Sequence, residues 1–218
     1  IKSGIKVGQK VVSSFGAVEL LKTDQSIPKN YYLIDIGANS TSVSLVGNSE
    51  LLATRSFSWG SDLITEKLIQ KFNISEAFAD SIKTLFGLDS RQTAFKYPLI
   101  QATESTPAYY REDINKTIEE ELQTCLSLLS SSIDQLNTQY KVNGMDLPIL
   151  LIGGGSKLHG LVDYFKTKLS KEEISLVTPK VIGGRDPSMF AVLGAVIVYN
   201  KYLSELDSNL AVNVLREE

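Results

Sequence analysis

The sequence predicts an α/β domain, and three patterns along the chain predict it. Within residues 31–59, some segments alternate apolar and polar side chains, and others are rich in β-branched and aromatic residues. Both patterns are typical of a meander of strands. Residues 112–136 repeat an apolar side chain every three or four positions, as a long amphipathic helix does. Residues 148–152 form a continuous apolar run that leads into three glycines and a helical pattern, so strands and helices alternate in the second half.

The first half opens with a short helix and continues as the meander. Val11 and Val12 are a brief β-prone run, and apolar spacing through Leu21 then predicts a helix. A polar linker containing Pro28 separates that helix from the strands. We expect the strands at residues 31–35, 42–46 and 51–59, with a turn at 36–41 joining the first two.

Helices dominate the middle of the chain and alternate with strands after it. Apolar side chains recur at helical spacing after Ser61 and again after Ser75, each of which can cap a helix. Residues 89–106 are irregular, and the long amphipathic helix follows. Asp186 and Pro187 mark the start of the last helix, as N-cap and first helical residue. The remaining elements are predicted as helices over 63–72 and 75–86, a strand over 148–152, a helix from Ser156, and a strand over 176–178.

Composition and charge exclude several classes of function. The 218 residues are 43% hydrophobic and 22% charged, as in an ordinary globular protein. With 22 basic and 25 acidic residues the formal net charge is −3, so no positive field draws nucleic acid or anionic lipid, and we expect no nucleic-acid partner. The lone Cys125 and the lone His159 supply neither a disulfide nor a zinc ligand set. The longest apolar run, 189–199, is too short to cross a membrane, which takes about 18 residues.

A turn that follows an acidic strand end is the first candidate site. Asp35 closes the first strand, and the turn behind it carries Gly37, Asn39, Ser40 and Thr41. Glycine and small hydroxyl residues let backbone N–H groups approach an anion, while a carboxylate at a strand end can hold a hydrated divalent cation. These residues indicate a site for phosphate with Mg²⁺. A hairpin turn in which Asn39 and Ser40 only satisfy their own backbone stays open as the alternative.

Three glycines between a buried strand and a helix start are the second candidate site. Gly153, Gly154 and Gly155 precede Ser156 and Lys157. Bare backbone at a helix start favours a flat or anionic ligand. The same glycines would also allow a strand and a helix to pack closely, and that steric explanation stays open. The run matches neither a P-loop nor a GxGxxG dinucleotide fingerprint.

Taken together and in this order, the two turns resemble the phosphate-2 and adenosine motifs of the actin, Hsp70 and sugar-kinase superfamily. The segments between and behind them resemble the FtsA and PilM actin-like proteins, and Ala38 after Gly37 is closer to PilM. The resemblance covers about residues 1–199. The residues that carry it are Arg55, Ser58 to Gly60, Leu63 to Thr65, Ala79 to Lys83 and Gly87, and later Leu151 to Gly155, Leu158, Gly160, Leu161, Asp186 to Ala191, Gly194 and Ala195.

The resemblance implies an actin-like, ribonuclease H-like subdomain whose mixed β-sheet is flanked by helices, with a smaller helical or α/β subdomain inserted in it. We place the core at residues 1–55 and 147–203, the inserted subdomain at 56–146 and a C-terminal tail at 204–218. The implied function is that of an assembly scaffold of the PilM kind, as in type IV pilus assembly, or of an FtsA-like tether in cell division.

The resemblance also implies a location and partners. Such a protein lies in the cytoplasm, peripheral to the inner membrane, and reaches the membrane through protein partners rather than by transmembrane insertion. A pilus version would bind a short cytoplasmic peptide of an inner-membrane protein, and a division version would bind the tail of the tubulin-like ring protein. Self-association is a further expectation.

Single residues receive roles around bound ATP and Mg²⁺ by the same resemblance. Asp35 would hold Mg²⁺ through water, and the β- and γ-phosphates would face Gly37, Asn39, Ser40 and Thr41. The ribose and base would be bordered by Gly60, Thr65, Glu66 and Lys67, although the usual acidic position falls on Lys67 and the acid sits beside it. The adenine and the α-phosphate would be lined by Gly153, Gly154, Gly155 and Ser156.

Two departures from the superfamily pattern limit the expected chemistry. Nothing before Asp35 offers the superfamily's other phosphate loop, and the chain begins at Ile1 without a signal-peptide pattern, so we expect a fragment with half a nucleotide cleft. For hydrolysis, only Ser13 and Ser14 are available to position water, which implies at most a weak ATPase. The rival interpretations are a metabolite kinase, a chaperone-like ATPase, and a fold that has lost nucleotide binding.

Overall fold

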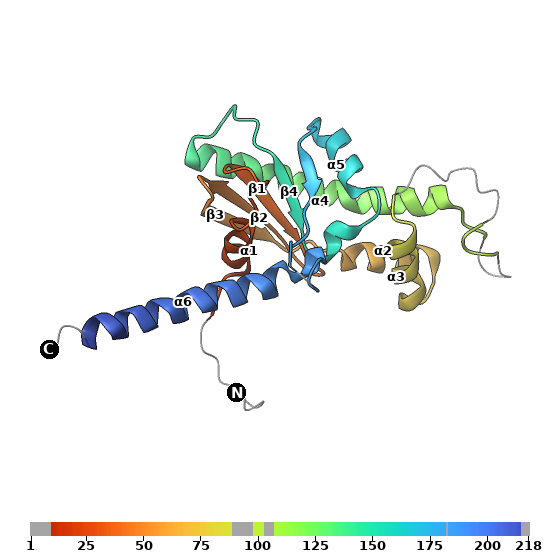
Figure 1. The fold of residues 1–218 in the computed structure, drawn as a ribbon. Coiled ribbons are helices and arrows are strands. Elements are labelled where there is room, and N and C mark those ends of the chain that lie inside the picture. Colours follow the sequence, from red (N-terminus) through yellow and green to blue (C-terminus); the bar gives the residue numbers. More distant parts are fainter. Residues whose placement is uncertain (1–9, 89–97, 103–106, 182, 215–218) are drawn as a thin grey trace.

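The computed structural model describes residues 10–88, 98–102, 107–181 and 183–214, and a mixed five-stranded sheet lies at its centre (Figure 1). The first three strands are antiparallel neighbours, and the last two run parallel to the first. The order across the sheet is β3-β2-β1-β4-β5. The strands are β1 (Tyr31–Ile36), β2 (Thr41–Gly47), β3 (Glu50–Phe57), β4 (Ile149–Ile152) and β5 (Ile174–Leu176). The α/β fold with a mixed sheet is thus confirmed.

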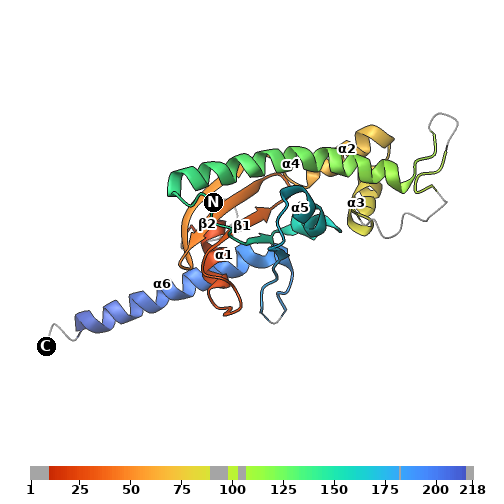
Figure 2. The same ribbon diagram turned by 90° about the horizontal axis from the view of Figure 1, so that it is seen from above.

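Helices cover both faces of the sheet. They are α1 (Ser13–Leu21), α2 (Asp62–Phe72), α3 (Glu76–Leu85), α4 (Arg111–Tyr140), α5 (Leu161–Leu169) and α6 (Phe190–Val214), with short 3₁₀ turns η2 (Gly154–Lys157) and η3 (Pro187–Met189). Figure 2 shows α4 along one side of the sheet and α1 with α6 along the other. In both views α6 extends well beyond the edge of the sheet.

The alternation of side chains along β1 divides the core between the two faces. Ile34 belongs to a cluster that includes side chains of α2 to α5, whereas Leu33 belongs to the cluster under α1 and α6. Both side chains are fully buried, because successive residues of a strand point to opposite faces and each face has a helical layer. A strand that buries apolar side chains on both faces therefore marks the centre of this three-layer fold.

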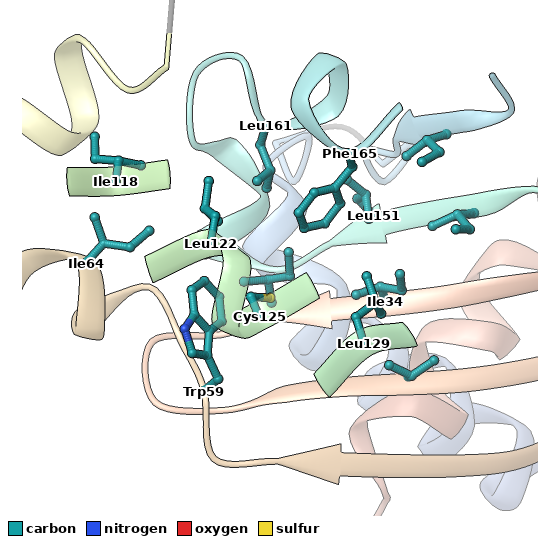
Figure 3. Close-up of a cluster of buried hydrophobic side chains, with 14 of the residues drawn as sticks. Ile34, Trp59, Ile64, Ile118, Leu122, Cys125, Leu129, Leu151, Leu161 and Phe165 are labelled. Carbon is teal, nitrogen blue, oxygen red and sulfur yellow. The ribbon is translucent and has the colours of Figure 1, made fainter. Parts of the chain in front are cut away.

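The long helix α4 joins the helical insertion to the sheet. Leu122, Cys125 and Leu129 on α4 lie in one buried cluster with Ile34 and Leu151 of the sheet (Figure 3). The same helix packs against α2 nearer its N-terminal end, where Ile118 lies beside Ile64 (Figure 3). The segment 56–146 therefore shares its core with the sheet, because α4 carries one apolar stripe through both parts.

Several element boundaries differ from the predicted ones. Val11 and Val12 lie outside any strand; Val12 has extended backbone as the residue before α1. The last strand is 174–176 rather than 176–178. The helix expected from Ser156 begins only at Leu161, because Gly160 has φ of +78° and separates η2 from α5. Most of the irregular stretch 89–106 lies outside the described residues.

The C-terminal helix also runs further than the predicted core. It continues to Val214, so the boundary placed between 203 and 204 falls inside α6. Tyr199, Tyr202 and Leu203 stay at least partly exposed on it. The segment from 204 to 214 is helical, because no glycine or proline interrupts the chain between Gly194 and Val214.

Candidate functional site

The two turns singled out from the sequence lie side by side at one edge of the sheet. β1 and β4 are parallel neighbours, with Asp35 in register with Ile152. Parallel neighbours end at the same edge, so the turn after β1 and the glycines after β4 meet there. In open α/β sheets this edge, beyond the carboxyl ends of the strands, is where ligands bind.

The three glycines play different structural roles. Gly153 has φ of +88°, and a Cβ on it would lie less than 3.0 Å from Oδ1 of Asp35 and from the Ile36 carbonyl oxygen. A Cβ on Gly155 would overlap the Ile36 side chain, at 2.5 Å from Cγ2. A Cβ on Gly154 would meet only the Cβ of Ser188, at 3.9 Å. Packing therefore demands the first and third glycines but leaves the middle one unexplained.

Asp35 is a half-buried carboxylate directly beside these glycines. Burial raises the pKa of its carboxyl group above the ordinary value of 3.8, and no neighbouring charge contributes among the described residues. A divalent cation would stabilise the ionised form of a carboxylate that is partly buried and has no cationic partner. Asp35 therefore fits the role of a single protein ligand to a Mg²⁺ ion whose other ligands are water and phosphate oxygens.

The turn between β1 and β2 exposes its tip. The Gly37 N–H donates to the Ser40 carbonyl at 2.9 Å, which closes the turn and leaves Asn39 and Ser40 exposed. Thr41 differs from them, because it is buried and its hydroxyl donates to the Trp59 carbonyl at 2.8 Å. Of the residues predicted to face phosphates, Asn39 and Ser40 are thus exposed, and the Asn39 amide donates to Oδ2 of Asp62 at 3.5 Å, while the Thr41 hydroxyl is engaged in the fold.

The start of α2 is fastened onto the same turn. The N–H groups of Ser61 and Asp62 donate to the carbonyls of Gly37 and Ala38, at 3.0 and 2.9 Å. A Cβ on Gly60 would lie less than 3.0 Å from the Ala38 carbonyl, so glycine is required for this close approach. Gly60 is therefore explained by packing between the two turns, and it brings Ser61 to the edge of the sheet.

A hollow of about 220 Å³ opens between these turns and α3. Its walls come from the start of α2, from one side of α3 and from η2. The residues that line it are Ser61, Asp80, Lys83, Thr84, Gly154, Gly155, Lys157 and Leu158. The open side of Gly154 therefore faces a space that a ligand can enter.

Lys83 provides the main positive charge inside the hollow. Its Nζ donates to Thr65 Oγ1 at 2.7 Å and lies 3.0 Å from Oδ1 of Asp80, and its side chain is only 12% exposed. The predicted site includes neither Asp80 nor Lys83, although both fall in a segment that carries the resemblance. The missed signal is their i, i+3 spacing, which puts both on one side of α3.

Four other predicted residues lie away from the hollow or are engaged elsewhere. Glu66 is exposed, and Lys67 forms an ion pair with Glu121 of α4 at 3.7 Å. Ser156 is buried, and its hydroxyl donates to the Gly153 carbonyl at 2.6 Å. Thr65 contacts the hollow only through Lys83. The helix pitch explains the first pair, since Glu66 and Lys67 point away from the side of α2 that bears Thr65.

The outer rim of the hollow carries an ion pair. Lys157 Nζ lies 2.6 Å from Oδ2 of Asp186, and Asp186 also accepts the Ser188 N–H as the cap of η3. The Lys157 ammonium and then the Ser188 N–H hold the pKa of the Asp186 carboxyl at about 2. This pair ties η2 to η3.

Neither serine considered for positioning water lines the hollow. Ser14 is buried on α1, where its hydroxyl accepts from Thr54 Oγ1 of β3 at 3.1 Å. Ser13 is exposed on the same helix. Within the described ranges, no three His, Cys, Asp or Glu side chains gather as a metal site, and no helix has the length and apolar content of a membrane span.

The sheet order, the helical layers and the hollow at the strand ends define an actin-like protein. Solved structures agree: MreB5 of Spiroplasma citri bound to ADP superposes with a TM-score of 0.69 at 14% identity, covering 94% of this chain and 64% of that one. The PilM-PilN type IV pilus biogenesis complex gives a TM-score of 0.63 at 20% identity, covering 88% of this chain and 53% of that one.

The family follows from the sequence match. The family model for the cell division protein FtsA matches residues 32–194, and the chain belongs to the FtsA family. Cell division protein FtsA of Streptococcus pneumoniae serotype 2 is 26% identical over 202 residues, which cover 88% of this chain and 42% of that protein. FtsA of Bacillus subtilis is 23% identical over 188 residues, covering 83% and 40%. The chain thus spans less than half the length of these relatives.

Proposed function

We propose that this chain is a nucleotide-binding part of a cell-division protein, which takes ATP or ADP with Mg²⁺ at the edge of the sheet. The observation that carries the proposal is that the Lys83 ammonium and the open backbone of Gly154 line one hollow, and that the Asp35 carboxylate lies beside the adjoining Gly153. Nucleotide binding by solved relatives of the same fold supports it, since MreB5 of Spiroplasma citri and the archaeal actin homologue Ta0583 both have structures with ADP.

The size of the hollow indicates which part of a nucleotide it would take. Pockets that enclose a whole drug-sized ligand usually measure about 300–1,000 Å³. At about 220 Å³, this hollow suits the base and sugar, with the flat base against the bare Gly154 backbone and the sugar hydroxyls near Asp80 and Lys83. The phosphates would extend outward toward Asn39 and Ser40, where Asp35 would share Mg²⁺ with them.

Cell division is the favoured process because the family is FtsA. On this proposal the protein works in the cytoplasm at the inner membrane, through protein partners and self-association, as a scaffold. The second candidate is a pilus-assembly platform, which the likeness to the PilM-PilN complex favours. Fluorescence anisotropy separates the two: a tail peptide of the tubulin-like ring protein should bind, and a cytoplasmic peptide of an inner-membrane pilus protein should not. The reverse result would select the pilus role.

Nucleotide binding is tested by calorimetric titration of this chain with Mg·ATP and Mg·ADP. We expect heat of binding from both, and a weaker response when the metal is chelated, because Asp35 would hold Mg²⁺ only together with phosphate oxygens. A version extended at the N-terminus should bind more tightly if residues before Ile1 complete the cleft. If neither version binds, the proposal fails, and the interpretation that the fold has lost nucleotide binding is favoured.

Lys83→Ala is expected to raise the Kd for Mg·ADP about tenfold, because a hydrogen bond from a charged donor contributes about 1.5–3 kcal/mol and part of it is replaced by water. Lys116→Ala is the matched control, since it removes the same charge from an exposed position of α4 outside the hollow lining. Equal Kd values for the two variants would show that the ammonium in the hollow does not contact the nucleotide.

A further inference from the structure

Two glycines hold α3 against the segment that follows η2. Gly87 has φ of +51° and Gly160 has φ of +78°. The Leu88 N–H donates to the His159 carbonyl at 2.8 Å. A Cβ on Gly87 would lie 2.7 Å from His159 Cβ and from its carbonyl oxygen, and a Cβ on Gly160 would lie 3.1 Å from Leu88. We call this pairing of backbones the Gly87–Gly160 contact.

The Gly87–Gly160 contact lies just beyond the two walls of the hollow. Gly87 follows Lys83 by one helical turn, at the C-terminal end of α3. Gly160 follows Gly154 by a few residues, at the end of η2 and before α5. The two walls therefore continue past the hollow, from Thr84 to Gly87 and from Leu158 to Gly160, and the two segments touch where the glycines are.

Apart from apolar side chains that belong to the common core cluster, few interactions link these two walls. In the described part of the chain, the bond from Leu88 to His159 is the one backbone hydrogen bond between 76–88 and 153–161. Lys83 bonds to α2 rather than to η2, and Lys157 pairs with Asp186 at the start of η3 rather than with α3. The separation of the walls thus depends on how closely the backbones of Gly87 and Gly160 approach.

We propose that the Gly87–Gly160 contact sets the width of the hollow and so positions Lys83 relative to the Gly154 backbone. This inference rests on the proposed function, in which both groups contact the nucleotide. Gly87 and Gly160 are positioning residues, because neither of them lines the hollow and both act through the walls. A side chain at Gly87 would press on the His159 backbone, which cannot rotate away as a flexible side-chain end can, and would force the walls apart.

The test compares Gly87→Ala with Gly144→Ala. Gly144 has φ of +83° and no atom lies within 4 Å of the place its Cβ would take, so its alanine variant suffers the same kind of backbone strain without the steric conflict. Spin labels on the exposed Ala77→Cys and Thr167→Cys positions report the distance between α3 and α5 without nucleotide. We expect Gly87→Ala to lengthen or broaden that distance and Gly144→Ala to leave it unchanged. An unchanged distance in Gly87→Ala would overturn the inference.

A nucleotide titration then connects the width to affinity. We expect Gly87→Ala to raise the Kd for Mg·ADP about tenfold, Gly144→Ala to leave it unchanged, and the Gly87→Ala effect to shrink in a Lys83→Ala background, because contacts that work through one group are not additive. Additive effects would overturn the positioning role. Gly160→Ala, with its milder 3.1 Å conflict, serves if Gly87→Ala does not fold. If the wild-type chain binds no nucleotide, the proposed function is refuted. If Gly87→Ala still widens the distance between α3 and α5, the inference that the Gly87–Gly160 contact sets the width of the hollow stands.

Discussion

Gly153→Ala is expected to destabilise the domain by about 3 kcal/mol or more, whereas the neighbouring Gly154→Ala should cost no more than about 0.5 kcal/mol. Gly153 has φ of +88°, where an L side chain is strained, and its Cβ would overlap the Ile36 carbonyl and the Asp35 carboxylate. Ile36 cannot move aside, because β1 is hydrogen-bonded to β2 on one side and to β4 on the other. The Cβ of Gly154→Ala would instead meet only the Cβ of Ser188, at an ordinary contact distance of 3.9 Å.

Urea unfolding followed by far-UV circular dichroism measures both free energies of unfolding. The same two variants separate packing from ligand binding, since Gly154→Ala should keep its stability and still weaken nucleotide binding by filling space against the base. Equal stability losses at the two positions would show that the glycine run serves the strand-to-helix turn alone. If Gly154→Ala has the same stability and the same nucleotide affinity as the wild type, the ligand binds elsewhere.

Asp35→Asn is expected to stabilise the nucleotide-free chain at neutral pH and to remove the Mg²⁺-dependent part of nucleotide affinity. Burial raises the pKa of Asp35 in the folded state above the ordinary 3.8, so the ionised carboxylate destabilises the folded chain once the pH exceeds that value. Relative to the asparagine variant, the wild type should therefore be less stable at about pH 7.5 and nearly equal below about pH 4. Thermal unfolding of both proteins over that range measures the difference.

Asp186→Asn supplies a control of opposite sign. The Lys157 ammonium holds the pKa of Asp186 at about 2, so this carboxylate stabilises the fold at neutral pH and loses that contribution as the pH falls toward about 2. Asp186→Asn should therefore be less stable than wild type at neutral pH, while Asp35→Asn is more stable. If Asp35→Asn instead destabilises the chain at neutral pH, its carboxylate has a structural partner and is not kept for a metal ion.

The local patterns of the chain predicted most of the fold. The three strands of the meander, the long helix α4 and the buried strand β4 occur close to their expected positions, because period-two and helical patterns reflect which side chains reach the core. The predicted boundaries are wrong for two short elements. The helix α5 starts later than predicted because Gly160 interrupts the helix, and β5 is displaced by a few residues. Short end elements have few side chains to define a period, so pattern alone places them poorly.

The site was predictable only in part, and Thr41, Ser156 and Lys83 show why. Thr41 and Ser156 are small hydroxyl residues in the right turns, yet both hydroxyls donate to backbone carbonyls of the fold. Lys83 comes from α3, far along the chain from either turn, and reaches the hollow through contacts with Thr65 and Asp80. Residue type and spacing identify which side chains could bind a ligand, but not which are already engaged.

The sequence by itself determined the α/β class, the two turns and the order in which they occur, because these depend on periodicity and on residues close together in the chain. Only the tertiary structure decided that Gly154 is open while Gly153 and Gly155 are packed, that Lys83 enters the hollow, and that Gly87 meets Gly160. Those facts depend on distances between segments that are remote in sequence, and such distances are set when the sheet and its helices pack together.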